Sequence, residues 1–228
     1  MRPMALFFHC LLFQDSPDCL IENAVNIVHA QMADAKRSGL LDAASEIVVG
    51  INGGEESRVM ASMLFPSKAR IVLHGLDCKT ENLTIREIEK WLPSNLGWHV
   101  LYFHSKGATR PPGDDLSTRW RCCMMRNLVI AWERCINDLD TFYESVGCHW
   151  LTKQGQTEDQ NLWAGTFWWA RSEYLATLPS IMLRDRIRIS GLKAAESRYE
   201  AEVWIGNGQR LPRVRDYHPR HPMIRTCR

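Results

Sequence analysis

The most informative residues in this sequence are polar side chains that come directly after an apolar run. Residues 100–103 have the composition of a buried strand, and His104, Ser105, Lys106 and Gly107 follow without a break. Lys106 could act as a point charge on a phosphate, while Gly107 lets the chain turn so that backbone N–H groups point at the same anion. We therefore predict an anion site here. The alternative is a solvated strand end, because lysines mostly stay in water.

Two arginines follow this segment, at the start of a stretch with helical periodicity. Arg119 and Arg121 flank Trp120. Guanidinium groups bind a diphosphate in a bidentate manner, and the dipole at a helix N-terminus favours the same anion. The two arginines could therefore clamp a diphosphate. Alternatively, they flank a packed tryptophan and keep their charges in water.

A pair of glutamates near the end of the sequence could supply a base. Glu200 and Glu202 stand at alternate positions, which face the same side in a strand but not in a helix. A glutamate whose pKa is raised in a partly apolar site can remove a proton from a hydroxyl group. The alternative is a pair of solvated surface acids, because glutamate is rarely buried. A second acidic pair, Asp114 and Asp115, follows Pro and Gly in a sequence typical of a turn.

A cluster of aromatic residues beside a glycine could form a flat wall for stacking against a sugar ring. It consists of Gly165, Thr166, Phe167, Trp168 and Trp169. The alternative is a set of core residues, because large aromatic side chains bury much apolar surface and dominate cores.

The elements that must position these residues alternate in type over the first half of the chain. Apolar runs predict strands at residues 4–13, 46–51, 70–74 and 99–103. Apolar residues at helical spacing predict helices at residues 20–41 and 85–92, the second opened by a capping box at Thr84 and Glu87. This alternation predicts an α/β fold with an open, mainly parallel sheet and helices on both faces.

Ligands of such sheets bind at the carboxyl ends of the strands. This rule places four segments at one edge, which we call the rim: the residues after Phe13, the Asn52-Gly53-Gly54 loop, the His74-Gly75-Leu76-Asp77 loop, and residues 104–107. The second half predicts a loop at 108–117, a helix at 120–139, a strand at 142–150 and a helix at 172–178. No repeat or linker divides the chain, so we predict one domain over residues 1–228.

Composition excludes several classes of protein. The 228 residues carry a formal net charge of only +2, so no field over the whole chain indicates a nucleic-acid partner. The basic tail at 210–228 is interpreted as solvated. No apolar run is long enough to span a bilayer, so a membrane contact would be peripheral, and residues 1–14 are interpreted as a strand rather than a signal peptide.

The eight cysteines contain no C-x-x-C pair, so the sequence does not signal a metal cluster. Several of them lie in apolar runs, where a free cysteine behaves as a small hydrophobic residue. A reducing compartment and a cytoplasmic location are therefore expected.

Five short motifs in a fixed order carry a resemblance to a known family. They are residues 100–107, Trp120-Arg121 at the head of a helix, Val146-Gly147-Cys148, residues 165–170 with Tyr174-Leu175, and residues 199–206. In this order they resemble uncharacterised bacterial and viral proteins of glycosyltransferase type, which are similar to polysaccharide-assembly transferases with the GT-A, nucleotide-diphospho-sugar fold. The resemblance covers roughly residues 20 to 206.

The resemblance implies a division of labour along the chain. Residues 1–107 would bind the nucleotide of the donor, with Asn52, Gly53 and Asp77 at the rim as further donor-binding residues. Residues 108–209 would hold the acceptor and the catalytic groups, with the segment from Gly165 to Ala170 and either Glu200 or Glu202 facing the acceptor.

The sequence departs from the metal-dependent members of this family. Those proteins carry an Asp-x-Asp motif after the fourth strand, which holds Mg²⁺ or Mn²⁺ against the diphosphate, whereas this strand ends in His104. Its one Asp-x-Asp match, Asp138-Leu139-Asp140, falls at a helix end. We favour neutralisation of the diphosphate by Lys106 with Arg119 or Arg121. The alternative is a divalent metal, Mn²⁺ or Mg²⁺, held weakly by His104 and a remote carboxylate.

The leading hypothesis is a glycosyltransferase that moves a sugar from a nucleotide-diphospho-sugar donor to a hydroxyl acceptor such as a glycan, with Glu202 or Glu200 as base. A non-catalytic carbohydrate- or nucleotide-binding domain is the alternative, and it needs no positioned carboxylate. An unrelated Rossmann-like enzyme is disfavoured because no G-x-G-x-x-G follows the first strand and no P-loop is present.

Overall fold

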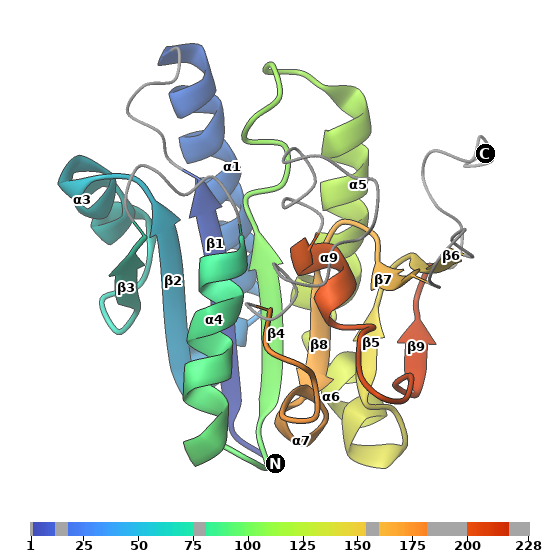
Figure 1. The fold of residues 1–228 in the computed structure, drawn as a ribbon. Coiled ribbons are helices and arrows are strands. Elements are labelled where there is room, and N and C mark those ends of the chain that lie inside the picture. The colour runs from blue at the N-terminus through green and yellow to red at the C-terminus, as the bar shows by residue number, and fades with distance from the viewer. Residues whose placement is uncertain (1, 12–17, 75–80, 154–159, 182–199, 219–228) are drawn as a thin grey trace.

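A computed structural model describes residues 2–11, 18–74, 81–153, 160–181 and 200–218. Its main sheet consists of β1 (Met4–Leu11), β2 (Glu46–Asn52), β3 (Arg70–Leu73), β4 (His99–His104), β5 (Ser145–Gly147), β8 (Trp168–Arg171) and β9 (Val214–Asp216). The spatial order is β3-β2-β1-β4-β8-β5-β9 (Figure 1). Strands β1 to β4 are parallel, β8 runs antiparallel to both β4 and β5, and β9 is parallel to β5. A separate ribbon pairs β6 (Trp150–Lys153) with β7 (Gln160–Trp163).

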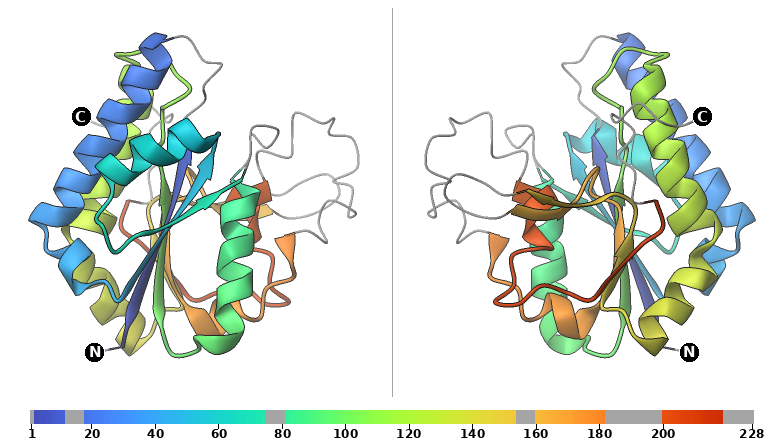
Figure 2. Two further views of the ribbon diagram at one scale, coloured as in Figure 1. Left: turned by 90° about the vertical axis from the view of Figure 1, so that its left-hand side faces the viewer. Right: turned by 90° about the vertical axis from the view of Figure 1, so that its right-hand side faces the viewer.

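Helices cover both faces of this sheet (Figure 2). One face carries α1 (Asp18–Arg37), α2 (Leu40–Ala43), α3 (Glu55–Leu64), α5 (Asp115–Met125), the π-helical turn η2 (Arg126–Ile130) and α6 (Trp132–Thr141). The other face carries α4 (Asn82–Trp91), the 3-10 turn η1 (Leu92–Ser94), α7 (Ser172–Leu175) and α9 (Glu200–Trp204). The predicted α/β architecture is therefore confirmed.

The strands separate two apolar layers because successive side chains of a strand point to opposite faces. In β1, Phe8 and Cys10 pack under the α1 layer, while Phe7 packs under α4. Tyr102 of β4 stacks on Trp168 of β8, with ring centroids 5.4 Å apart. In the part of the chain that is described, no helix is both long and apolar enough to cross a membrane.

Several predicted boundaries are wrong, each for a local reason. The capping box at Thr84 and Glu87 does not open the helix, because α4 begins at Asn82. Thr84 lies inside the helix, and its hydroxyl contacts His9 Nδ1 at 2.8 Å. The helix predicted at 120–139 begins earlier, because the Asp114 carboxylate accepts the Ser117 N–H and caps α5. The strand predicted at 142–150 is two strands, β5 and β6, separated by the left-handed residue His149 (φ 65°).

Candidate functional site

The described strands β1, β2 and β4 end at one rim of the sheet. Their register pairs Leu11 with Asn52 and His9 with His104, so the carboxyl ends of these strands lie side by side. Residues 12–17 and 75–80, which the sequence also places at this rim, lie outside the described residues, and Asp77 is among them. The rim site is therefore described from β2, β4 and the elements that approach them.

Two of the predicted anion-binding residues shape the turn after β4. The buried Ser105 hydroxyl accepts the Leu11 N–H at 3.2 Å. Gly107 has φ 92°, and Arg121 Nη1 lies within 2.9 Å of the place where a Cβ on Gly107 would stand. Arg121 Nη1 also donates to the Lys106 carbonyl oxygen at 2.7 Å. Ser105, Gly107 and Arg121 thus hold the backbone from which the Lys106 side chain projects.

His104 is a neutral, buried imidazole at the end of β4. Its Nε2 lies 2.9 Å from the Gly165 carbonyl oxygen, to which it donates, and its Nδ1 lies 3.5 Å from Glu81 Oε1. Burial, reinforced by the nearby Lys106 ammonium, lowers the pKa of His104 to about 3. The imidazole therefore links β4 to the Gly165 turn without carrying a charge at neutral pH.

Glu81 is a site residue that the sequence did not reveal. It directly precedes α4, and one of its carboxylate oxygens accepts the Tyr102 hydroxyl at 2.9 Å while the other faces His104. No motif surrounds Glu81 in the sequence, so only its position after β3 could have indicated that it belongs to the site. Glu81 adds a second carboxylate to the site.

Lys106 and Trp120 are in direct contact. The Lys106 Nζ lies 3.8 Å from the centroid of the Trp120 ring, a cation–π geometry. A Cβ at Gly165, which has φ 89°, would lie 3.1 Å from the same ring. The Trp120 ring, which we call the Trp120 wall, is therefore close to both the Lys106 ammonium and the Gly165 turn.

Glu202 brings a partly buried carboxylate to the same place from the far end of the chain. Burial raises its pKa, and the carboxylate of Glu81 acts in the same direction. The Lys106 ammonium and a hydrogen bond with the Gly165 backbone oppose the shift. A partly buried carboxylate with a raised pKa has the properties of a general base.

Glu200 faces elsewhere, because residues 200–204 form helix α9 and not a strand. Its carboxylate accepts Asn82 Nδ2 at 2.5 Å and so ties α9 to the start of α4. The two glutamates are therefore separated by the helical geometry that the sequence left open. Glu202 is under the electrostatic influence of Lys106, and Glu200 joins two helices.

The remaining predicted donor-binding residues differ in how exposed they are to solvent. Arg119 is 68% exposed and pairs with Asp115 at 2.8 Å on the outside of α5. Asn52 and Gly53 are buried at the end of β2. The structure brings together Lys106, His104 and Glu202, and it gives Arg119 a surface ion pair.

The aromatic segment lies in the core. Phe167, Trp168 and Trp169 are completely buried, and Trp169 Nε1 donates to the Leu128 carbonyl oxygen at 2.8 Å. Thr166, at φ 59°, is also buried. In this structure the rings present no face to a sugar, so the packing alternative describes them, and Gly165 is the member of this segment that borders the site.

The end of β4 offers both suitable and unsuitable groups for a resident Mn²⁺ or Mg²⁺ ion. These hard cations take oxygen ligands, which the carboxylates of Glu81 and Glu202 could supply, but Lys106 already interacts with Glu202 and His104 Nε2 is engaged with Gly165. Lys106 therefore stays the proposed countercharge of the diphosphate. The Asp-x-Asp match is used elsewhere: Asp138 accepts the Tyr217 hydroxyl at 2.7 Å, and Asp140 lies 2.9 Å from His99 Nε2.

Comparison with known proteins gives only distant likenesses. No protein-family model and no curated protein matches the chain. A 4-diphosphocytidyl-2C-methyl-D-erythritol synthase is 13% identical, with a TM-score of 0.43 over 77% of this chain and 78% of the other. A protein assigned as a nucleotide-diphospho-sugar transferase from Desulfovibrio desulfuricans G20 is 11% identical, with a TM-score of 0.46 over 87% and 72%.

The manganese complex of Rv0371C from Mycobacterium tuberculosis H37Rv is 13% identical, with a TM-score of 0.33 over 84% of each chain. All three TM-scores lie below 0.5, so these likenesses do not establish the class of this chain. The similarity is too low to transfer the role of any residue.

Proposed function

We propose that the protein is a glycosyltransferase that uses a nucleotide-diphospho-sugar donor and a hydroxyl acceptor. The observation that carries the proposal is the position of Glu202, which hydrogen-bonds the backbone of Gly165, the residue whose carbonyl oxygen lies 2.9 Å from His104 Nε2 at the end of β4, within the electrostatic influence of Lys106. A base and a cation at the rim of a parallel sheet fit a reaction in which a hydroxyl loses a proton and a diphosphate leaves.

In the proposed reaction, Glu202 accepts the proton of the acceptor hydroxyl as its oxygen bonds to the anomeric carbon. The bond from that carbon to the diphosphate breaks, and the leaving oxygen takes the electron pair. The negative charge that develops there is stabilised by Lys106, whose position against Trp120 is fixed. The loop at Asn52 and Gly53 remains our candidate for further donor contacts, and residues 108–209 remain the proposed acceptor half.

Donor binding is tested by thermal shift with UDP, GDP, CDP and dTDP, each with and without Mn²⁺. A ligand at about 100 times its Kd stabilises the folded state by about 2.7 kcal/mol. For a domain of this size the expected rise in Tm is roughly 5–10 °C. No rise with any nucleotide would refute the donor site, and a rise that requires Mn²⁺ would refute the metal-free site.

The role of Glu202 as the base is tested in a transfer assay. Its donor is a sugar attached to the nucleoside diphosphate that gives the largest thermal shift. Glu202→Gln should retain the thermal shift and lose about 10²–10⁴-fold in kcat. Glu200→Gln on the same helix is the matched control and should retain kcat. If wild-type protein binds the donor and transfers nothing to any hydroxyl, the non-catalytic binding domain is the better assignment.

A further inference from the structure

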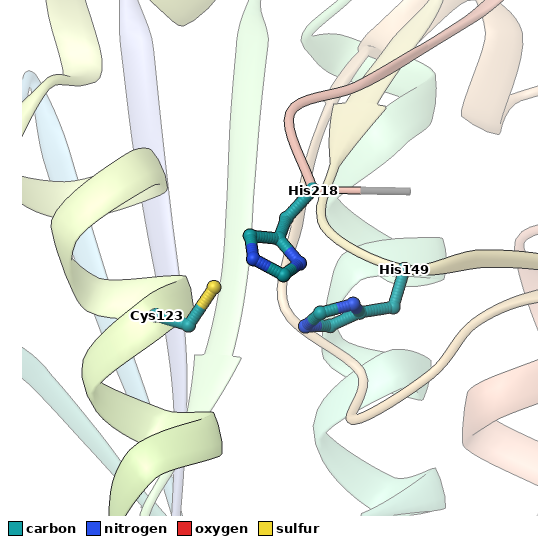
Figure 3. A group of neighbouring side chains, drawn as sticks. All are labelled: Cys123, His149 and His218. Carbon is teal, nitrogen blue, oxygen red and sulfur yellow. The ribbon is translucent and has the colours of Figure 1, made fainter. Parts of the chain in front are cut away.

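Three metal-binding side chains converge beside α5, away from the end of β4. Cys123 lies on α5, His149 follows β5, and His218 follows β9. One ligand atom from each residue lies within 4.8 Å of the other two. Figure 3 shows the three side chains pointing toward one another from separate backbone segments. One thiolate and two imidazoles are ligands of the kind that zinc prefers.

The backbone around the two histidines is held by one carboxylate. Asp216 in β9 accepts the N–H groups of His149, Trp150 and His218, each at 2.9 Å. His149 also adopts φ 65°, which is uncommon for a residue other than glycine. The same group therefore fixes both imidazole-bearing residues before any ion arrives, which is the role that outer-shell carboxylates have in metal sites.

The sulfur of Cys123 is placed to act as a ligand. The thiols of Cys123 and Cys148 are hydrogen-bonded to each other. Cys148 is fully buried, while Cys123 and His218 are partly exposed. An ion can thus reach Cys123 from solvent, with the Cys148 thiol donating to it from the core side.

We propose that Cys123, His149 and His218 bind one zinc ion, with water in the fourth position. Zinc bonds of about 2.3 Å to sulfur and about 2.0 Å to nitrogen place tetrahedral ligands roughly 3.3–3.6 Å apart. The observed spread of up to 4.8 Å closes to this range by small side-chain rotations. The site joins three segments that are distant in the sequence: α5, the turn before β6, and the residues after β9.

This metal site adjoins the rim through Trp120. The centroids of the Trp120 and His149 rings lie 6.2 Å apart in an edge-to-face arrangement. The Lys106 Nζ lies 3.8 Å from the centroid of the Trp120 ring. An ion that fixes Cys123, one helical turn further along α5, also fixes the ring on which Lys106 rests. The zinc site is nevertheless independent of whether the rim transfers a sugar.

Metal content of the full chain, purified under reducing conditions without chelator and then given zinc and desalted, tests the proposal. Wild type should hold about one zinc per chain. Cys123→Ser and His218→Ala should fall to the background level, and Cys122→Ser, an exposed neighbour on the same helix, should keep its zinc. Wild type without zinc, or Cys123→Ser with full zinc, would overturn the site.

A second measurement does not depend on the folding of a variant. Co²⁺ added to chelator-treated wild type should produce a thiolate-to-cobalt absorption band that Zn²⁺ abolishes. Absence of that band would overturn the proposal. Mass spectrometry of the purified chain, with and without reduction, is the third test. A disulfide between Cys123 and Cys148 that persists when metal is added would also overturn the proposal.

Discussion

Replacing Glu144 tests how the edge of the sheet is held. Glu144 precedes β5, and its buried carboxylate receives Arg210 Nη1 at 2.7 Å, Arg210 Nη2, and the Arg213 N–H at 3.1 Å. These groups lower the pKa of Glu144 from 4.5 to about 2, with the Arg210 hydrogen bonds as the main cause. The charge of this one carboxylate therefore ties the segment before β9 to the sheet.

The size of the effect follows from the pKa difference. A shift of this size corresponds to at most about 3.4 kcal/mol of folding stability. Arg210 is 61% exposed, so solvent screens the pair and we expect about 1–2 kcal/mol. Because the folded-state pKa is lowered, the contribution is complete above pH 4.5 and is lost as pH falls toward about 2.

The measurement is urea unfolding of wild type and Glu144→Gln at several pH values. The free-energy difference between them should be about 1–2 kcal/mol at neutral pH and should shrink as the medium is acidified below pH 4.5. Glu133→Gln, an exposed acid on α6, is the control and should stay within about 0.5 kcal/mol of wild type. An equal loss at neutral and acid pH would refute the charge argument, because it would indicate lost packing.

Further predictions concern packing, protonation and the Trp120 wall. Gly206→Ala should lower stability by at least about 1–3 kcal/mol, because a Cβ there would overlap the backbone carbonyl group of Asn161 in β7; an unchanged Tm would contradict this packing of the turn that follows α9. Stability should fall as pH drops below 6.5, because burial lowers the pKa of His9 while the unfolded chain takes up the proton. His9→Gln should reduce that slope in urea titrations, and a slope equal to wild type would count against His9 as its source. Trp120→Leu should weaken binding of the nucleotide found by thermal shift about 2- to 30-fold, which Trp120→Phe should largely avoid; equal affinities in calorimetry would exclude the wall.

The first half of the fold was predictable because its apolar periodicity is strong. The runs that became β1, β2, β3 and β4 are bounded by turn residues, so a mainly parallel sheet and the rim at its carboxyl ends followed from general rules. The later strands were harder, because β5 and β8 are short and take their places by pairing with partners far away in the sequence. Local patterns carry no information about such pairing.

The site was only partly predictable. The sequence proposed Lys106 and both glutamates from residue type and position, and their roles stay predictions. Whether residues 200–204 form a helix decides which glutamate is under the influence of Lys106, and the sequence left that open. The aromatic segment was ambiguous because the same rings suit a core and a sugar-stacking wall. Glu81 and the Cys123 cluster gave no signal, since their partners come together only through the tertiary fold.

The late insertion of β8 has a consequence for biosynthesis. Strand β4 pairs with β1 on one side and with β8 on the other, so one edge of β4 stays open until residues 105–167 have been translated. At about 5–20 residues per second, a nascent chain exposes that apolar edge for several seconds. An unpaired edge invites association with other chains, so production of this protein should depend on chaperones and on slow, cool expression.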